Sequence, residues 1–270
     1  MMPHTTAVNI SVVYQTKGRI IPTSCACASG SLAIGYAYEA IKHGYQSIMI
    51  AGGAEELDAT EAAVFDTLYA TSIKNDAPST SPRPFDIDRD GLVIGEGAAT
   101  LVLEEYNHAV DRGAHIYAEV VGFGTNSDGN HVTQPTQATM EVAMNMALQD
   151  ADLSPSEIGY VSAHAAATYA GDEAESLATV NVLGNDVPIS SLKGYFGHSL
   201  GACGAIEAWI AVKGLDENWF PANHNLNKVD PKCGQLDYVM NAPREIQCQY
   251  LMSNNFAFGG MNTSLIFRRP

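Results

Sequence analysis

Positively charged residues are scarce in this sequence. It has 270 residues, of which 14 are Lys or Arg and 30 are Asp or Glu, so its formal net charge is −16. Nucleic-acid binding depends on Lys and Arg contacts to phosphate, and the same cations drive docking on anionic membranes. We therefore expect neither kind of partner. Apolar runs of the roughly 18 residues that span a bilayer are also lacking, so we expect no membrane insertion.

Cysteine is scarce as well. The five cysteines are Cys25, Cys27, Cys203, Cys233 and Cys248. Their number is odd and their spacing fits neither a disulfide framework nor a common zinc site, which favours a reducing compartment. The first residues show no basic region followed by an apolar stretch, so we expect no signal peptide. These absences predict a cytoplasmic protein.

Apolar residues make up 46% of the chain, enough for a substantial core. Strand-like and helix-like patterns alternate along it. Strands are expected over 20–25, 47–53, 98–104, 116–122, 158–163, 188–192, 250–253 and 263–267. Helices are expected over 29–43, 140–151, 172–183 and 202–215. This alternation predicts an α/β architecture with largely parallel, buried sheets.

The stretch Thr23-Ser-Cys-Ala-Cys-Ala-Ser-Gly30 places Cys27 where a predicted strand turns into a helix. A helix N-terminus favours a thiolate, and its free backbone N–H groups can bind an oxyanion. Cys27 is therefore a candidate nucleophile. The alternative is that Cys25 and Cys27 are both inert core residues.

Three further loops follow predicted strands. His164 ends the strand 158–163, a Gly-rich stretch carries Lys193 and His198, and the last loop contains Gly259 and Gly260. Ligands bind at the carboxyl ends of parallel strands in open α/β sheets. Taken alone, His164 could be a surface or core histidine whose hydrogen bonds are satisfied. The loop with Gly259 and Gly260 could be a tight turn. Together with Cys27, however, the four loops point to one convergent site.

These motifs, in this order, resemble those of the β-ketoacyl-[acyl-carrier-protein] synthases of the elongating type. The matching stretches are Cys27-Ala-Ser-Gly, Ala-His164, Lys193 to Gly-His198-Ser-Leu-Gly-Ala, and Asn255-Phe-Ala-Phe258-Gly-Gly-Met-Asn262. The resemblance extends from about Thr6 to Phe267. It implies a thiolase-type fold of two similar βαβαβαββ halves, here 1–112 and 113–270. It also implies that the first strands of the N-terminal half are missing, which would expose apolar faces and strand edges.

The resemblance also implies a mechanism. Cys27 takes an acyl group from a carrier protein as a thioester, and His164 and His198 assist decarboxylation of a malonyl thioester. The backbone N–H groups of Cys27 and Phe258 form the oxyanion hole. The product is a β-ketoacyl thioester of fatty-acid, polyketide or polyene synthesis. No metal and no redox cofactor is implied.

Further roles come from the same resemblance. Lys193 organises the histidines, and Glu207 and Asp172 support the site. Phe258 acts as a gate between acyl and malonyl access, and Thr168 contacts the pantetheine arm. The implied partners are acyl carrier protein, acyl and malonyl thioesters, and a second synthase subunit in a homodimer or heterodimer.

The chain departs from the family pattern in two ways. Ala165-Ala166-Ala167 follows His164 where the family has Gly-Thr and a small residue, so one pantetheine hydrogen bond worth roughly 0.5–1.5 kcal/mol is lost. The strong negative charge opposes an acidic carrier protein. Lys74, Arg83, Arg89 and Arg112 are possible contributors to a docking patch.

Two other functions are weighed. A thiolase would use coenzyme A and a second catalytic cysteine near the end of the chain, where this sequence has Asn255 to Gly260. A non-catalytic partner, similar to a chain-length factor, or an inactive fragment would need no nucleophile, and Cys27 argues against it.

Overall fold

The computed structural model describes residues 2–270. The helices are α1 Thr5–Tyr14, α2 Ser29–Lys42, α3 Ala59–Thr67, α4 Tyr106–Asp111, α5 Gln137–Ala151, α6 Tyr169–Leu183, α7 Lys193–Phe196 and α8 Cys203–Glu217, with short 3-10 turns at η1 Ala26–Ala28, η2 Pro78–Thr80, η3 Pro155–Glu157 and η4 Leu200–Ala202. The strands are β1 Ile48–Glu55, β2 Gly97–Glu104, β3 Glu119–Ser127, β4 Ile158–Ser162, β5 Pro188–Ser190, β6 Trp219–Phe220, β7 Asp237–Tyr238, β8 Arg244–Glu245, β9 Tyr250–Ala257 and β10 Met261–Arg268.

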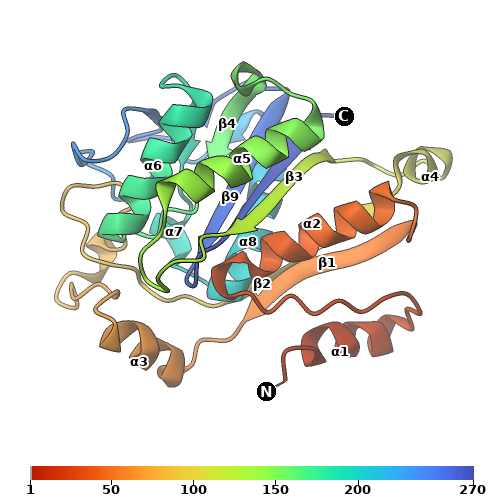
Figure 1. The fold of residues 1–270 in the computed structure, drawn as a ribbon, viewed down its shortest axis with the longest axis horizontal. Coiled ribbons are helices and arrows are strands. Elements are labelled where there is room, and N and C mark those ends of the chain that lie inside the picture. The colour runs from red at the N-terminus through yellow and green to blue at the C-terminus, as the bar shows by residue number, and fades with distance from the viewer. Residues whose placement is uncertain (1) are drawn as a thin grey trace.

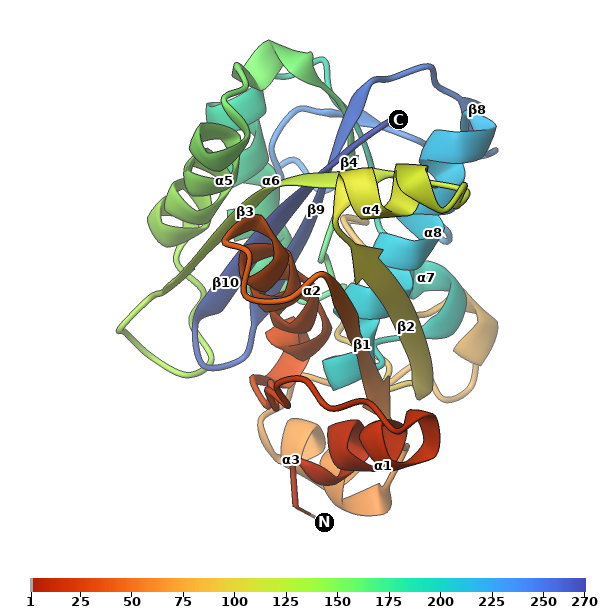
Figure 2. The ribbon, with the colours of Figure 1, turned by 90° about the vertical axis from the view of Figure 1, so that its right-hand side faces the viewer.

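A six-stranded mixed sheet forms the centre of the molecule, in the order β3-β10-β9-β4-β5-β7. The β9, β4, β5 and β7 strands run parallel to one another, whereas β10 is antiparallel to both β9 and β3. Figure 2 shows α5 and α6 on one side of this sheet and α2 with β1 and β2 on the other. The sheet is therefore covered on both faces, as its nearly continuous apolar strands require.

A second, antiparallel pair of strands, β1 and β2, packs on the far side of α2 and α8 (Figure 1). The two helices lie against each other between the sheets. A Cβ atom on Gly30 would lie 2.6 Å from the backbone nitrogen of Ala205. Only glycine permits this approach, which brings the start of α2 to the start of α8.

One face of the β1–β2 pair carries exposed apolar side chains. Ile48 is 45% exposed and Val102 is 65% exposed. The expectation that part of the N-terminal half would expose apolar surface is therefore confirmed. No helix within residues 2–270 combines the length and apolarity needed to cross a membrane.

Most elements predicted from the sequence are present. Strands overlap the predicted ranges 47–53, 98–104, 116–122, 158–163, 188–192, 250–253 and 263–267, and helices overlap 29–43, 140–151, 172–183 and 202–215. The predicted strand over 20–25 is wrong. No strand of the described chain pairs with this segment, and Ile20 and Ile21 are 43% and 39% exposed. A strand without a neighbour has no ladder of hydrogen bonds to hold it.

Candidate active site

Cys27 lies in the 3-10 turn η1 that leads into α2, and its side chain is buried. Ala26 adopts a φ of 47°, in the left-handed region, where the chain reverses before the helix. The Ser29 hydroxyl stabilises this turn: it donates to the carbonyl of Ala26 over 2.7 Å and accepts from the backbone N–H of Cys25 over 2.9 Å. The reversal aims the Cys27 thiol at the end of the central sheet.

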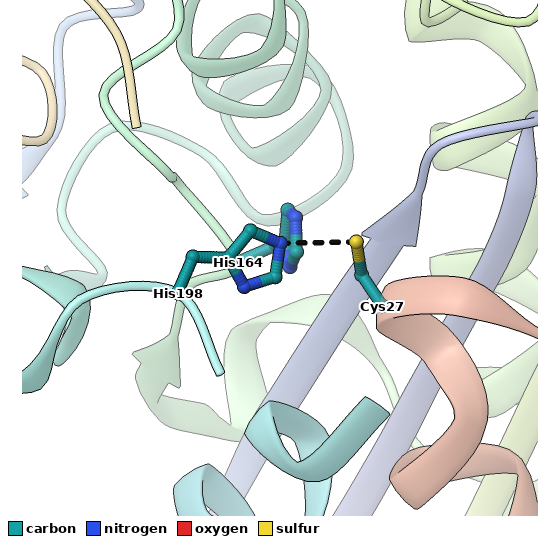
Figure 3. Close-up of side chains that lie close together, drawn as sticks. All are labelled: Cys27, His164 and His198. Atoms are coloured by element: carbon teal, nitrogen blue, oxygen red, sulfur yellow. Dashed lines mark hydrogen bonds between the residues drawn. The ribbon is translucent and has the colours of Figure 1, made fainter. Parts of the chain in front are cut away.

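Two histidines face this thiol from different loops (Figure 3). The Nε2 atom of His198 lies 2.9 Å from the Cys27 Sγ atom. His164 follows β4, and its ring centroid lies 5.2 Å from that of His198. The backbone of His198 bonds to the Val93–Gly95 segment over 2.7 and 2.9 Å, which fixes its loop. Both rings are buried.

Burial controls the protonation of these groups. It raises the pKa of Cys27, although the backbone N–H groups of Phe258 and Cys27 and the charge of Lys193 act to lower it. Burial also holds the pKa of His164 and of His198 well below its usual range, and the Lys193 charge adds to this. The three groups therefore rest as a thiol and two neutral imidazoles. The helix N-terminus, from which the sequence predicted a thiolate, is outweighed by desolvation.

A buried ion pair supports the histidines. Lys193 and Glu207 are both fully buried and bonded to each other. The Lys193 Nζ atom lies 3.4 Å from the Nδ1 atom of His164. Burial acts to lower the pKa of Lys193, but Glu207, Cys203 and Glu175 together outweigh it and the pKa is raised, so the ammonium charge persists. The Glu207 carboxylate also accepts from the Asn255 amide over 2.7 Å.

The loop behind His164 is held by carboxylates from α6. Glu175 accepts from the backbone N–H groups of His164 and Ala165 over 2.7 and 2.6 Å. Asp172 accepts from the N–H of Phe85 over 2.8 Å, and burial raises its pKa to about 6. The sequence prediction included Asp172 but missed Glu175. The available signal was the i, i+3 spacing of two acidic residues on one helix face.

Thr168 caps the N-terminus of α6, but its side chain makes no capping hydrogen bond. It is half-buried, and its carbonyl accepts from the Arg89 Nε atom over 3.3 Å. Just before it, Ala167 is buried with a φ of 66°. Phe258 lies between β9 and β10, and its ring packs edge-to-face on Phe65 of α3 with 5.8 Å between centroids.

The structure thus brings five predicted residues together: Cys27, His164, Lys193, His198 and Glu207. The backbone N–H of Phe258 acts to lower the pKa of the Cys27 thiol. Asp172 lies on α6 and Thr168 lies at the N-terminus of this helix, behind His164.

Two overlapping sets of side chains have ligand atoms close enough together to hold a metal ion. Cys27, His164 and His198 each offer a ligand atom, all within 4.8 Å of one another, and so do His164, Cys203 and Glu207. The Lys193 ammonium contacts Glu207 and His164. A second cation at this distance would meet strong repulsion in a buried environment, so the geometry favours thiol and imidazole chemistry.

The chain is similar to known proteins. The family described as the N-terminal domain of β-ketoacyl synthase matches residues 1–109, and the C-terminal domain of the same family matches residues 117–227. A 3-oxoacyl-[acyl-carrier-protein] synthase 2 of Vibrio cholerae is 42% identical over 97% of this chain. A putative polyketide β-ketoacyl synthase of Streptomyces cyaneus is 39% identical over 99% of it. This chain spans 65% of the length of each of these relatives.

Solved structures agree. A β-ketoacyl synthase from Burkholderia phymatum is 62% identical, superposes with a TM-score of 0.99, and is covered to 66% of its length. A type II polyketide ketosynthase solved with its acyl-carrier protein is 33% identical with a TM-score of 0.94, and 67% of its length is covered. These superpositions confirm the predicted thiolase-type α/β fold. The chain belongs to the β-ketoacyl synthase family.

Proposed function

We propose that this chain carries the condensing site of a β-ketoacyl-[acyl-carrier-protein] synthase. The observation that carries this proposal is the contact of 2.9 Å between Cys27 Sγ and His198 Nε2, beside a second neutral imidazole, His164. A nucleophile with a base in hydrogen-bond reach is the usual arrangement for acyl transfer. Two neutral imidazoles add donors for a developing enolate.

The first step is transfer of an acyl group to Cys27. The thiol gives its proton to the imidazole of His198 and attacks the thioester carbonyl of an acyl-carrier protein. The tetrahedral oxyanion accepts hydrogen bonds from the backbone N–H groups of Cys27 and Phe258. Both groups act to lower the pKa of the resting thiol. The carbon–sulfur bond to the carrier breaks, and the departing thiolate takes the proton. Cys27 is left as a thioester.

The second step is decarboxylative condensation. The malonyl thioester loses CO₂, and the electron pair of the broken bond moves into an enolate. The Nε2–H group of His164 stabilises the enolate oxygen, and His198 joins it once its ring proton has moved from Nδ1 to Nε2. Both rings must be neutral, as burial makes them. The enolate carbon attacks the acyl carbonyl on Cys27. The carbon–carbon bond forms, the bond to Cys27 sulfur breaks, and the departing Cys27 thiolate takes a proton from solvent.

The proposed partners are acyl carrier protein and a second synthase subunit. One solved relative is a ketosynthase in complex with its acyl-carrier protein, and others are ketosynthases with their chain length factors. We propose that 1–112 and 113–270 act as the two halves of one site, the first supplying Cys27 and the second supplying His164 and His198. The proposal extends to fatty-acid, polyketide or polyene precursors as substrates.

A non-catalytic or incomplete subunit is the second candidate. The exposed apolar face of β1 and β2 favours it, because Ile48, Ile50 and Val102 are 45%, 36% and 65% exposed. Such a surface is usually covered by other polypeptide. A subunit of this kind would bind a synthase without forming an acyl-enzyme.

Intact mass spectrometry separates the two candidates. The chain is incubated with a carrier protein that bears a saturated acyl chain. The variants Cys27→Ala and Cys248→Ala are treated in the same way. Cys248 is half-buried and bonds through its backbone to Arg269, so its removal controls for adventitious thiol acylation. The proposal predicts an acyl adduct on wild type and on Cys248→Ala, and none on Cys27→Ala. Folded protein without any adduct would favour the non-catalytic subunit.

A further inference from the structure

One fully buried amide next to the site has no part in the steps above. Asn255 lies on β9 and is 0% exposed. Its side chain contacts Ser31 of α2, Glu207 of α8 and the ring of His164. It therefore joins the two helices between the sheets to one of the proposed catalytic histidines.

The chemistry of its partners fixes the orientation of this amide. A Glu207 carboxylate accepts hydrogen bonds only, so the group 2.7 Å from its Oε2 atom must be the NH₂ group of Asn255. The Asn255 Oδ1 atom then faces the Ser31 hydroxyl, which donates to it. The second N–H of the amide is left between His164 Nδ1, at 3.4 Å, and the sulfur of Cys203, at 3.7 Å.

Two donors therefore converge on the same ring nitrogen. Lys193 Nζ, which can only donate, is also 3.4 Å from His164 Nδ1. A nitrogen faced by two donors is an acceptor and carries no proton. In a neutral imidazole the proton must then be on Nε2, the atom on the opposite edge of the ring.

We propose that Asn255 is a positioning residue that holds His164 as its Nε2–H tautomer. The catalytic consequence rests on the proposed function, since only an Nε2–H can donate to the enolate oxygen. Asn255 also acts on the ion pair: it binds Oε2 of Glu207 while Lys193 binds Oε1. Each oxygen of the carboxylate is thereby bound by one donor, and the Lys193 ammonium stays within reach of Nδ1.

The tautomer can be observed without any turnover. Nitrogen-15 NMR of histidine-labelled protein distinguishes a protonated ring nitrogen from an unprotonated one, and comparison with His164→Gln assigns the signals among the eight histidines. The inference predicts an unprotonated Nδ1 and a protonated Nε2 for His164 in the wild-type chain. A protonated Nδ1 would overturn it, whether or not the chain is active.

Two substitutions test the part that Asn255 plays. Asn255→Ser shortens the side chain and removes the N–H that faces His164 Nδ1, so a larger share of the ring is expected to carry its proton on Nδ1. Asn255→Leu removes both the donor and the acceptor and leaves Lys193 alone to hold the tautomer. Asn254→Leu is the matched control, because Asn254 is the adjacent buried residue on the other face of the strand and has no hydrogen-bond partner.

The kinetic readout separates positioning from folding. Loss of one hydrogen bond predicts a fall of up to about tenfold in the kcat of malonyl decarboxylation for Asn255→Leu, with KM little changed. Asn254→Leu should match wild type in kcat and in the NMR spectrum. Asn255→Ser and Asn255→Leu spectra that show the wild-type share of Nδ1 protonation would refute the role of Asn255. An inactive wild-type chain with the predicted tautomer would instead refute the proposed function.

Discussion

Replacing Lys193 with Met is predicted to destabilise the fold in a pH-dependent way. The substitution removes a fully buried ammonium and leaves the Glu207 carboxylate with the Asn255 amide as its remaining partner. Breaking a buried ion pair by removing one member costs about 3–5 kcal/mol, because the other charge stays buried without compensation. The double variant Lys193→Met/Glu207→Gln removes both charges and should recover most of this loss.

The pH dependence follows from Glu207. Burial raises its pKa above the ordinary value of 4.5, and Lys193 acts to lower it. Without Lys193 the folded-state pKa rises further, so the folded protein binds this proton more tightly than the unfolded chain does. The associated stability is fully present below the unfolded pKa and is lost as the pH rises through the folded pKa. One proton gives a slope of up to about 1.4 kcal/mol per pH unit.

Urea unfolding of the three proteins at several values between about pH 5 and 8 measures this. The Lys193→Met variant should lose stability relative to wild type as the pH rises, and the double variant should lack this additional slope. Equal slopes in the single and double variants would contradict the reasoning. So would a Lys193→Met variant as stable as wild type across the range.

Three other perturbations have defined outcomes. Alkylation of Cys27 should show an apparent pKa above 9, because burial raises the thiol pKa from its ordinary value of 9.0; a midpoint near neutrality would contradict a resting thiol. Gly30→Val should lower thermal stability by about 1–3 kcal/mol through overpacking against Ala205, and an unchanged transition would contradict this close approach of α2 to α8. Glu175→Gln should cost about 1–3 kcal/mol in urea unfolding, since an amide can accept only one of the two N–H groups that Glu175 binds; an unchanged midpoint would refute this.

The sequence predicted those parts of the fold that depend on local pattern. Apolar runs entering glycines predicted β1 and the strands around the site, and Cys27, His164 and His198 were found because each lies just beyond an expected strand or at a turn into a helix. The site was located because such ends converge in parallel sheets.

The parts that escaped prediction depend on neighbours. Residues 20–25 have an apolar start typical of a strand, but a strand exists only where another strand pairs with it. The helix α1 has no buried residue and several β-branched side chains, so its sequence lacks the apolar periodicity that would predict a helix. Asn255 and Ser31 are 224 positions apart in the chain, and only the packing of β9 against α2 brings them together. Glu175 was missed because its partners are backbone N–H groups, and its spacing from Asp172 on one helix face was the sequence feature that pointed to it.

The central claim is that Cys27 and the two histidines form a working condensing site. It is tested most directly by mixing the acylated chain with malonyl-carrier protein that is carbon-13 labelled at the free carboxyl. The account predicts release of labelled CO₂ together with a β-ketoacyl-carrier protein and loss of the Cys27 adduct, and it predicts that His164→Gln abolishes the CO₂ release while keeping the adduct. An acylated, folded chain that releases no CO₂, or a His164→Gln variant that condenses as wild type does, would contradict it.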